Sequence, residues 1–228
     1  MSISIILPAY NEEEGVQHAI RAIPQNDLLQ QGYVCEVIVV DNNSTDQTAA
    51  FARVLGARVV QETRQGYGLA HRAGIAQSSG NIIVAADADG SYPLKELPRL
   101  LAIFHDQDLD FLMTNRFKKT WRPSAMPVVN AIGNHLLTTV VKTFFRLPIQ
   151  DSQSGMWIVR RSFMEQMKLY ATGMAFSQEV KIECIYYLRG KWKEVAIGYQ
   201  RRVGTKKLRL LRDGIGNLMF LVKKRIRR

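Results

Sequence analysis

Cysteine and acidic residues are scarce in this sequence of 228 residues, and the two scarcities narrow its possible functions. Cys35 and Cys184 each lie in an apolar run, without the spacing of a metal knuckle or a disulfide framework. We therefore expect reduced core thiols and a cytosolic protein. Asp and Glu total 20 against 31 Lys and Arg, a net charge of +11. That charge favours anionic partners such as nucleic acid, phosphorylated ligands or acidic lipid headgroups.

Long apolar runs, repeats and low-complexity tracts are also missing, apart from the basic end at 223–228. No stretch approaches the roughly 20 uninterrupted apolar residues that span a bilayer. The N-terminus lacks the basic region and longer apolar stretch of a secretory signal, so we expect folding to start at residue 1. With 46% hydrophobic and 22% charged residues, the composition predicts one domain with a substantial core.

Short β-branched runs alternate with helix-compatible stretches through the first half of the chain. Strands are predicted at 3–7, 36–40, 58–61, 82–86 and 111–114, and helices at 12–23, 46–55, 67–77 and 94–105. Continuous apolar strands with helices between them predict an α/β protein, whose mostly parallel sheet is flanked by helices. Ligands of such sheets bind beyond the carboxyl ends of the strands.

The stretch 127–146 predicts a long amphipathic helix. Its apolar residues recur at four-residue intervals, namely Val128, Ile132, Leu136, Val140 and Phe144. This periodicity leaves open whether the stripe packs on the core or lies in a membrane interface. The apolar segment 218–222 and the basic end 223–228 add the combination that holds monotopic proteins on anionic lipid. We expect one domain over 1–210 and a short amphipathic, basic tail over 211–228.

Polar clusters follow three predicted strands, at 8–12, 41–46 and 87–90. Asp87 and Asp89 flank one alanine, so their carboxylates leave the strand on the same side, close enough to share a divalent cation. The alternative is a loop whose aspartates cap the next helix. Asp41 ends a buried strand, where its carboxylate would accept hydrogen bonds from a nucleobase or ribose, or else form an Asx turn or helix cap.

With these clusters the sequence resembles the family 2 glycosyltransferases of the GT-A fold. The resemblance rests on PAYNEE at 8–13, VVDNNSTDQT at 39–48, GYGLA at 66–70 and DADG at 87–90. DSQSG at 151–155 and RVGTKKL at 202–208 narrow it to the polyprenyl-phosphate or dolichyl-phosphate mannosyl- and glucosyltransferase branch, over residues 1 to about 210. It implies an inverting enzyme that moves a hexose from a GDP- or UDP-hexose to a polyprenyl phosphate at the cytosolic membrane face.

The resemblance also implies roles for single residues. Asp89, with Asp87, would hold Mg²⁺ or Mn²⁺ on the donor diphosphate. Arg202 and Lys207 would close over the same phosphates, unless they belong to a solvated basic surface. The donor pocket as a whole would consist of Pro8, Tyr10, Glu12, Val39, Asp41, Asp87, Ala88, Arg202 and Lys207.

The acceptor half of the site is predicted from phosphate chemistry. Arg116, with Arg122 or Lys118 nearby, is expected to hold the acceptor phosphate, because a guanidinium matches phosphate oxygens bidentately. Asn134 belongs to the same predicted acceptor set. A phosphate is already ionised at neutral pH, so it needs no strong general base.

Other functions are kept as alternatives. If the acceptor is a hydroxyl in glycan or cell-envelope synthesis, Glu179 is the reserve base, unless it is an ordinary helix-face carboxylate. A non-catalytic nucleic-acid-binding module would account for the positive charge, but it would not place acidic residues at three strand ends. A nucleotidyltransferase is disfavoured because the glycine-rich N-terminal loop is missing from 8–13.

Overall fold

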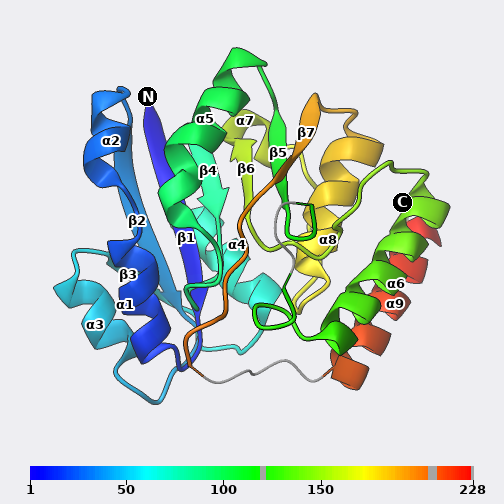
Figure 1. Ribbon diagram of the computed structural model, residues 1–228, viewed down its shortest axis with the longest axis horizontal. Coiled ribbons are helices and arrows are strands. Elements are labelled where there is room, and N and C mark those ends of the chain that lie inside the picture. The colour runs from blue at the N-terminus through cyan, green and yellow to red at the C-terminus, as the bar shows by residue number, and fades with distance from the viewer. Residues whose placement is uncertain (119–121, 205–209, 227–228) are drawn as a thin grey trace.

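The computed structural model describes residues 1–118, 122–204 and 210–226, and it is built around one seven-stranded sheet with helices on both faces (Figure 1). The strands lie in the order β3 (Arg58–Gln61), β2 (Val34–Asp41), β1 (Ser2–Ala9), β4 (Ile82–Ala85), β6 (Trp157–Arg160), β5 (Phe111–Asn115) and β7 (Trp192–Ala196). Only β6 runs antiparallel to its neighbours in this sheet. The predicted α/β fold with a mostly parallel sheet is confirmed.

The helices divide between the two faces of the sheet. They are α1 (Glu13–Arg21), α2 (Gln25–Gln30), α3 (Thr48–Val54), α4 (Tyr67–Gln77), η1 (Leu94–Glu96), α5 (Leu97–Asp106), α6 (Val128–Phe145), α7 (Arg161–Met164), α8 (Phe176–Lys181), the π-helical turn η2 (Ile182–Tyr187) and α9 (Leu210–Ile226). Successive strand residues face opposite sides. Ile5 accordingly joins the apolar cluster under α1 and α5, whereas Ile6 joins the one under α4 and α8.

Strand register brings the predicted polar clusters to one edge of the sheet. In the parallel pair β1 and β2, Ala9 lies opposite Asp41, and in the pair β1 and β4, Ile6 lies opposite Ala85. The segments that follow these three strands therefore start close together. Cys184 is buried and Cys35 is half-buried, and both are free thiols.

Helices α6 and α9 lie side by side at the end of the molecule that carries β7 and α8 (Figure 1). Leu221 of α9 is fully buried in the second apolar cluster, so this part of the predicted tail packs onto the domain. Within the described part of the chain, no helix combines the length and the apolar character needed to cross a bilayer.

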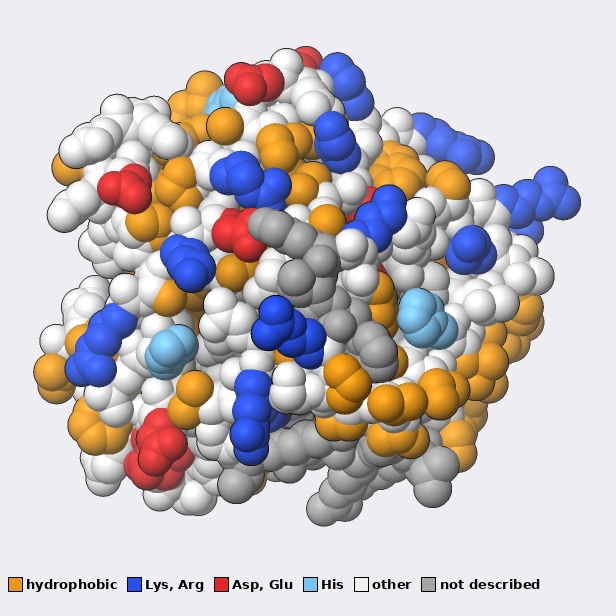
Figure 2. All heavy atoms as spheres, viewed as in Figure 1, with side chains coloured by type: hydrophobic (Ala, Val, Ile, Leu, Met, Phe, Trp, Pro, Cys, Tyr) orange, Lys and Arg blue, Asp and Glu red, His pale blue; other side chains and the backbone are white. Residues whose placement is uncertain are grey.

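The apolar stripe of α6 faces outward. Ile132 and Leu136 are 64% and 65% exposed, whereas the opposite face, including Thr138 and Val141, is buried. Helix α9 repeats this arrangement, because Ile215 and several other apolar residues are exposed. We call the two stripes together the apolar face; it consists of Val128, Val129, Ile132, Leu136, Phe144, Ile215, Leu218, Met219, Val222 and Ile226. Hydrophobic side chains gather at the lower right of the space-filling view (Figure 2).

Candidate active site

The loops after β1 and β2 are tied together by side chains. The amide of Asn11 donates to Ser44 Oγ at 3.0 Å, and the amide of Thr45 donates to Asn11 Oδ1 at 2.8 Å. Asn11 adopts a left-handed conformation, φ 52°, which asparagine tolerates better than most residues. The amide of Ser44 donates to Asp41 Oδ1 at 3.1 Å, so the predicted nucleotide ligand also serves a turn. These hydrogen bonds hold the two loops together on one side of the site.

Two acidic residues and one arginine meet beside these loops. Arg202 forms an ion pair with Glu12, and its Nη1 lies 3.6 Å from Asp89 Oδ2. Asp89 Oδ1 also accepts the amide of Ser91 at 2.9 Å. Residues that the sequence places 190 positions apart are therefore brought together. Arg202 balances part of the negative charge at the strand ends.

Asp87 is half-buried beside a tyrosine and a glycine, whereas Asp89 is 8% exposed. Tyr67 Oη donates to Asp87 Oδ1 at 2.9 Å. Burial, and then the negative charge of Asp89, raise the pKa of Asp87 to about 7. A Cβ added to Gly155 would lie 2.8 Å from Tyr67 Oη and 2.9 Å from Asp87 Oδ1. Any larger residue at 155 would therefore have to displace the Tyr67 hydroxyl or the Asp87 carboxylate.

Among the described residues, no three His, Cys, Asp or Glu side chains are grouped so that they could hold a metal ion together. The site does offer the carboxylates of Asp87 and Asp89, which are the hard oxygen ligands that Mg²⁺ and Mn²⁺ prefer. Mg²⁺ in phosphate-transfer sites is commonly held by one or two carboxylates, and substrate phosphates and waters supply the remaining ligands. The raised pKa of Asp87 comes first from burial and then from the negative charge of Asp89, and a bound cation would offset both effects. The donor set fits the predicted metal.

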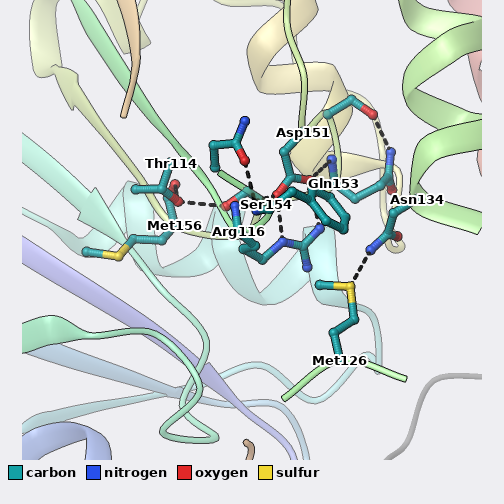
Figure 3. A network of polar contacts seen from close by, with 12 residues as sticks. Thr114, Arg116, Met126, Asn134, Asp151, Gln153, Ser154 and Met156 are labelled. Atoms are coloured by element: carbon teal, nitrogen blue, oxygen red, sulfur yellow. Dashed lines mark hydrogen bonds and ion pairs between the residues drawn. The ribbon is translucent and has the colours of Figure 1, made fainter. Parts of the chain in front are cut away.

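Arg116 is held in a buried ion pair. Its Nε and Nη2 donate to the two oxygens of Asp151, each at 2.8 Å, and its backbone amide donates to Asp151 Oδ2 at 3.1 Å (Figure 3). Burial alone would lower the pKa of Arg116, but the attraction of Asp151 outweighs this effect, so the pKa lies well above its ordinary value. Arg116 is 7% exposed. The predicted phosphate ligand is therefore a fixed cation with a set orientation.

The other predicted acceptor residues lie around Arg116. Tyr199 stacks on the Arg116 guanidinium, 5.4 Å from ring centroid to Cζ. With Arg122 and Arg201, Tyr199 lines an open pocket of about 360 Å³. Asn134, on α6, donates to Met126 Sδ at 3.4 Å (Figure 3). Two arginines, Arg122 and Arg201, thus line a pocket whose Tyr199 also contacts the buried ion pair.

Glu179 is a buried carboxylate whose contacts stabilise the fold. It is fully buried, and its oxygens accept the amides of Tyr170 and Ala171 at 2.8 to 2.9 Å. Lys224 of α9 donates to Glu179 Oε1 at 2.8 Å and lies 2.7 Å from Glu183 Oε1. Glu179 is thus a buried ion-pair partner of α9, which differs from the ordinary helix-face carboxylate of the alternative. The same contacts also correct the interpretation of 223–228 as one cationic patch, because Lys224 is only 5% exposed.

The remaining predicted donor residues differ in accessibility. Pro8 and Tyr10 are half-buried at the end of β1, and Glu12 is 8% exposed. Val39 and Ala88 are buried in the first apolar cluster, so they support the pocket from the core side. Lys207 lies outside the described residues.

Sequence reasoning assigned no role to Tyr67, Asp151 or Lys181, although all three are placed at the site. The only signal for them was that Tyr67 and Asp151 fall inside the GYGLA and DSQSG segments. Lys181 carries no such signal.

Comparison with known proteins identifies the class to which this site belongs. The family model described as glycosyl transferase family 2 matches residues 4–167. The chain is therefore a member of glycosyl transferase family 2, and it is a glycosyltransferase. The alternative of a non-catalytic nucleic-acid-binding module is wrong.

The relatives of this chain include two proteins from Haloferax volcanii. The low-salt glycan biosynthesis hexosyltransferase Agl6 is 31% identical over 97% of this chain and 53% of its own length, so this chain spans about half of that relative. A dolichyl-phosphate hexose transferase is 30% identical over 90% of this chain and 86% of its own length. The predicted resemblance to the polyprenyl-phosphate branch is confirmed by such relatives.

Among solved structures, glucosyl-3-phosphoglycerate synthase from Mycobacterium tuberculosis, in complex with Mn²⁺, UDP and phosphoglyceric acid, superposes with a TM-score of 0.75. It is 23% identical, and the match covers 98% of this chain and 78% of that one. This likeness confirms the GT-A fold.

Proposed function

We propose that this glycosyltransferase moves a hexose from a GDP- or UDP-hexose to a polyprenyl phosphate at the cytosolic face of a membrane. The proposal rests on the two faces of helix α6, one of which packs against the site while the other is exposed. Its inner face contacts the segment that holds Arg116, because Thr138 Oγ1 lies 3.0 Å from Ser152 Oγ. Its outer face exposes Ile132 and Leu136. A lipid phosphate has a charged head and an apolar tail, which suit these two faces.

The donor half would use the acidic strand ends. Asp41 would accept hydrogen bonds from the base or ribose, and Asp87 would face the sugar nucleotide, with Ala88 buried behind it. Asp89, with Asp87, would hold Mg²⁺ or Mn²⁺, which as a Lewis acid would take up charge on the departing diphosphate. Arg202, now paired with Glu12, would contact the diphosphate, and so would Lys207.

The acceptor half would use Arg116. Asp151 engages Nε and Nη2 of the guanidinium. Nη1 carries two further N–H donors, which would bind the acceptor phosphate, with Arg122 and Asn134 nearby. The phosphate oxygen would attack the anomeric carbon in line, and the configuration would invert. Since the phosphate is already ionised, the reaction needs no strong base, and the structural role of Glu179 agrees with that.

The acceptor is tested by measuring nucleoside diphosphate release. The full-length protein and Mn²⁺ are incubated with a panel of nucleotide-sugars, with and without a short polyprenyl phosphate. We expect one donor to be consumed at least about tenfold faster when the polyprenyl phosphate is present. Release that is unaffected by the lipid, for every donor, would contradict the proposed acceptor.

Membrane attachment would depend on the apolar face and on exposed basic residues near it. Lys142, Lys223 and Arg225 are exposed on α6 and α9. Each such cation contributes about 1 kcal/mol near an anionic surface, and salt weakens this contribution. Burial of the apolar stripe would not depend on charge.

Vesicle sedimentation separates the two contributions. We expect full-length protein to sediment with anionic vesicles at low salt, and much less with neutral ones. Leu136→Asp should reduce sedimentation at any salt concentration, whereas Lys223→Gln with Arg225→Gln should reduce only the salt-sensitive part. Val54→Asp is the matched control, because Val54 is 83% exposed on α3, at the far side of the sheet (Figure 1). Full-length protein that stays in the supernatant under all conditions would contradict membrane attachment.

A further inference from the structure

Lys181, at the end of α8, is a fully buried lysine beneath residues 151–155. Its Nζ donates to the backbone carbonyls of Ser152 at 3.0 Å, Ser154 at 2.6 Å and Ser177 at 3.1 Å. A buried ammonium is unfavourable unless all its protons find acceptors, and here three carbonyls accept them. Burial still lowers the pKa of Lys181 to about 7. An apolar side chain would fill the same space without this cost.

Two of the three carbonyls belong to the segment 151–155, which we call the bridging loop. Its first residue, Asp151, holds the guanidinium of Arg116. Its last residue, Gly155, lies so close to Asp87 that an added Cβ would be 2.9 Å from Oδ1. The loop therefore connects the predicted acceptor ligand with the predicted donor carboxylate.

The bridging loop is also held from its sides. Thr138 Oγ1 accepts the amide of Ser152 at 3.1 Å, and Tyr92 Oη accepts the amide of Gly155. Gln153 Oε1 accepts Gln178 Nε2 at 3.2 Å and Asn217 Nδ2 at 3.4 Å. Those partners each hold one residue of the loop. Lys181 alone among the described side chains binds the backbone carbonyls of two, Ser152 and Ser154.

We propose that Lys181 is a positioning residue, which fixes the bridging loop and thereby sets the placement of Arg116 relative to Asp87. The assignment of these two residues to acceptor and donor rests on the proposed function. Lys181 contacts neither substrate in this proposal. Its contribution is geometric, and an error of about 1 Å in the placement of two reactants can cost on the order of 100-fold in rate.

The test compares Lys181→Met with Val180→Ala in the full-length protein. Methionine keeps the apolar bulk and removes the three donated hydrogen bonds, whereas Val180 is an equally buried neighbour on α8. Hydrogen exchange of the amides in 152–155 is measured first, since it needs no substrate. We expect about tenfold faster exchange in Lys181→Met and no local change in Val180→Ala. Equal exchange in the two variants would overturn the proposal.

Kinetics with a short polyprenyl phosphate give the second measurement. We expect kcat for transfer to fall 10- to 100-fold in Lys181→Met, while the KM for the nucleotide-sugar stays within about twofold. Lys181→Gln, which keeps one amide group with two N–H donors, should recover part of the rate and also serves if the methionine variant fails to fold. If the KM for the nucleotide-sugar rises by as large a factor as kcat for transfer falls, Lys181 has a general structural role and the proposal is overturned.

The two proposals fail in different ways. If the wild-type protein transfers nothing to a polyprenyl phosphate, the proposed acceptor is wrong, and the exchange measurement still decides whether Lys181 holds the loop. If the wild-type protein transfers the sugar and Lys181→Met does so equally well, the positioning role is wrong and the proposed function stands.

Discussion

Replacing Lys224 with methionine tests how the last helix is attached to the enzyme. Lys224 Nζ lies 2.8 Å from Glu179 Oε1 and 2.7 Å from Glu183 Oε1, and it donates to the carbonyl of Lys168 at 2.8 Å. All three charged side chains are at most 3% exposed. Lys224→Met leaves two buried carboxylates without their cation.

The expected loss in the free energy of unfolding follows from the burial of this ion pair. Removing one partner of a buried ion pair costs about 3–5 kcal/mol, because the remaining charge stays uncompensated. Glu179 keeps its backbone donors at Tyr170 and Ala171, which favours the lower end of that range. The neighbouring Lys223 is exposed, so Lys223→Met should change the free energy of unfolding by less than about 0.5 kcal/mol.

Urea unfolding followed by tryptophan fluorescence measures the free energy of unfolding of both variants, because Trp157 is fully buried and becomes exposed on unfolding. In thermal unfolding, a loss of about 3 kcal/mol corresponds to a decrease in Tm of roughly 6–12 °C for a chain of this size. Only Lys223→Met should weaken vesicle binding, because Lys223 is exposed and Lys224 is buried. A Lys224→Met protein as stable as Lys223→Met would refute the buried triad, and with it the way α9 is held.

Three further substitutions address the donor pocket and the fold. Asp41→Ala should raise the KM for the nucleotide-sugar with little change in kcat, because the carboxylate is proposed to contact the base or ribose; a collapsed kcat with unchanged KM would place it at the reaction centre. Asp89→Ala, like chelation by EDTA, should abolish transfer and leave the circular dichroism spectrum intact, and full activity in either case would remove the metal-dependent mechanism. Burial alone would raise the pKa of Glu36, but hydrogen bonds from Ser4 and Ser79 outweigh it and lower the pKa to about 2. Its stabilising contribution is therefore complete above the ordinary pKa of about 4.5 and is lost as the pH falls towards 2. Glu36→Gln should cost about 1–3 kcal/mol at pH 7 and clearly less at pH 3; an equal loss at both pH values in urea unfolding would contradict this.

The local periodicity of the sequence was sufficient to predict the strands of the donor half of the sheet. The ranges predicted for β3 and α4, 58–61 and 67–77, match the structure, and the predicted strand ends meet at one edge. Parallel strands with buried faces carry continuous apolar runs, and their polar residues can only follow the strand ends. That pattern is local and visible in sequence.

The acceptor half depends on contacts that no local pattern reveals. Strand β6 has four residues, and it inserts antiparallel between β4 and β5, more than 40 positions after the nearer of them. In the sequence, nothing distinguishes Lys224 from the other basic residues near it. Only the fold brings it to Glu179 and Glu183. Helix α6 shows the same limit, because periodicity identified its apolar stripe but could not tell whether that stripe faced inward.

The nature of the acceptor is tested most directly by a pair of lipids that share one tail. A short polyprenyl phosphate and the corresponding polyprenol are each incubated with the full-length protein, Mn²⁺ and the donor that the panel selects, and the lipid products are identified by mass spectrometry. We predict a hexosyl phosphate lipid from the first and no glycosylated product from the second, because Arg116 would bind a phosphate, whereas Glu179, the base expected for a hydroxyl acceptor, is buried in an ion pair with Lys224. Equal glycosylation of the polyprenol, or no lipid product from either, would contradict the account.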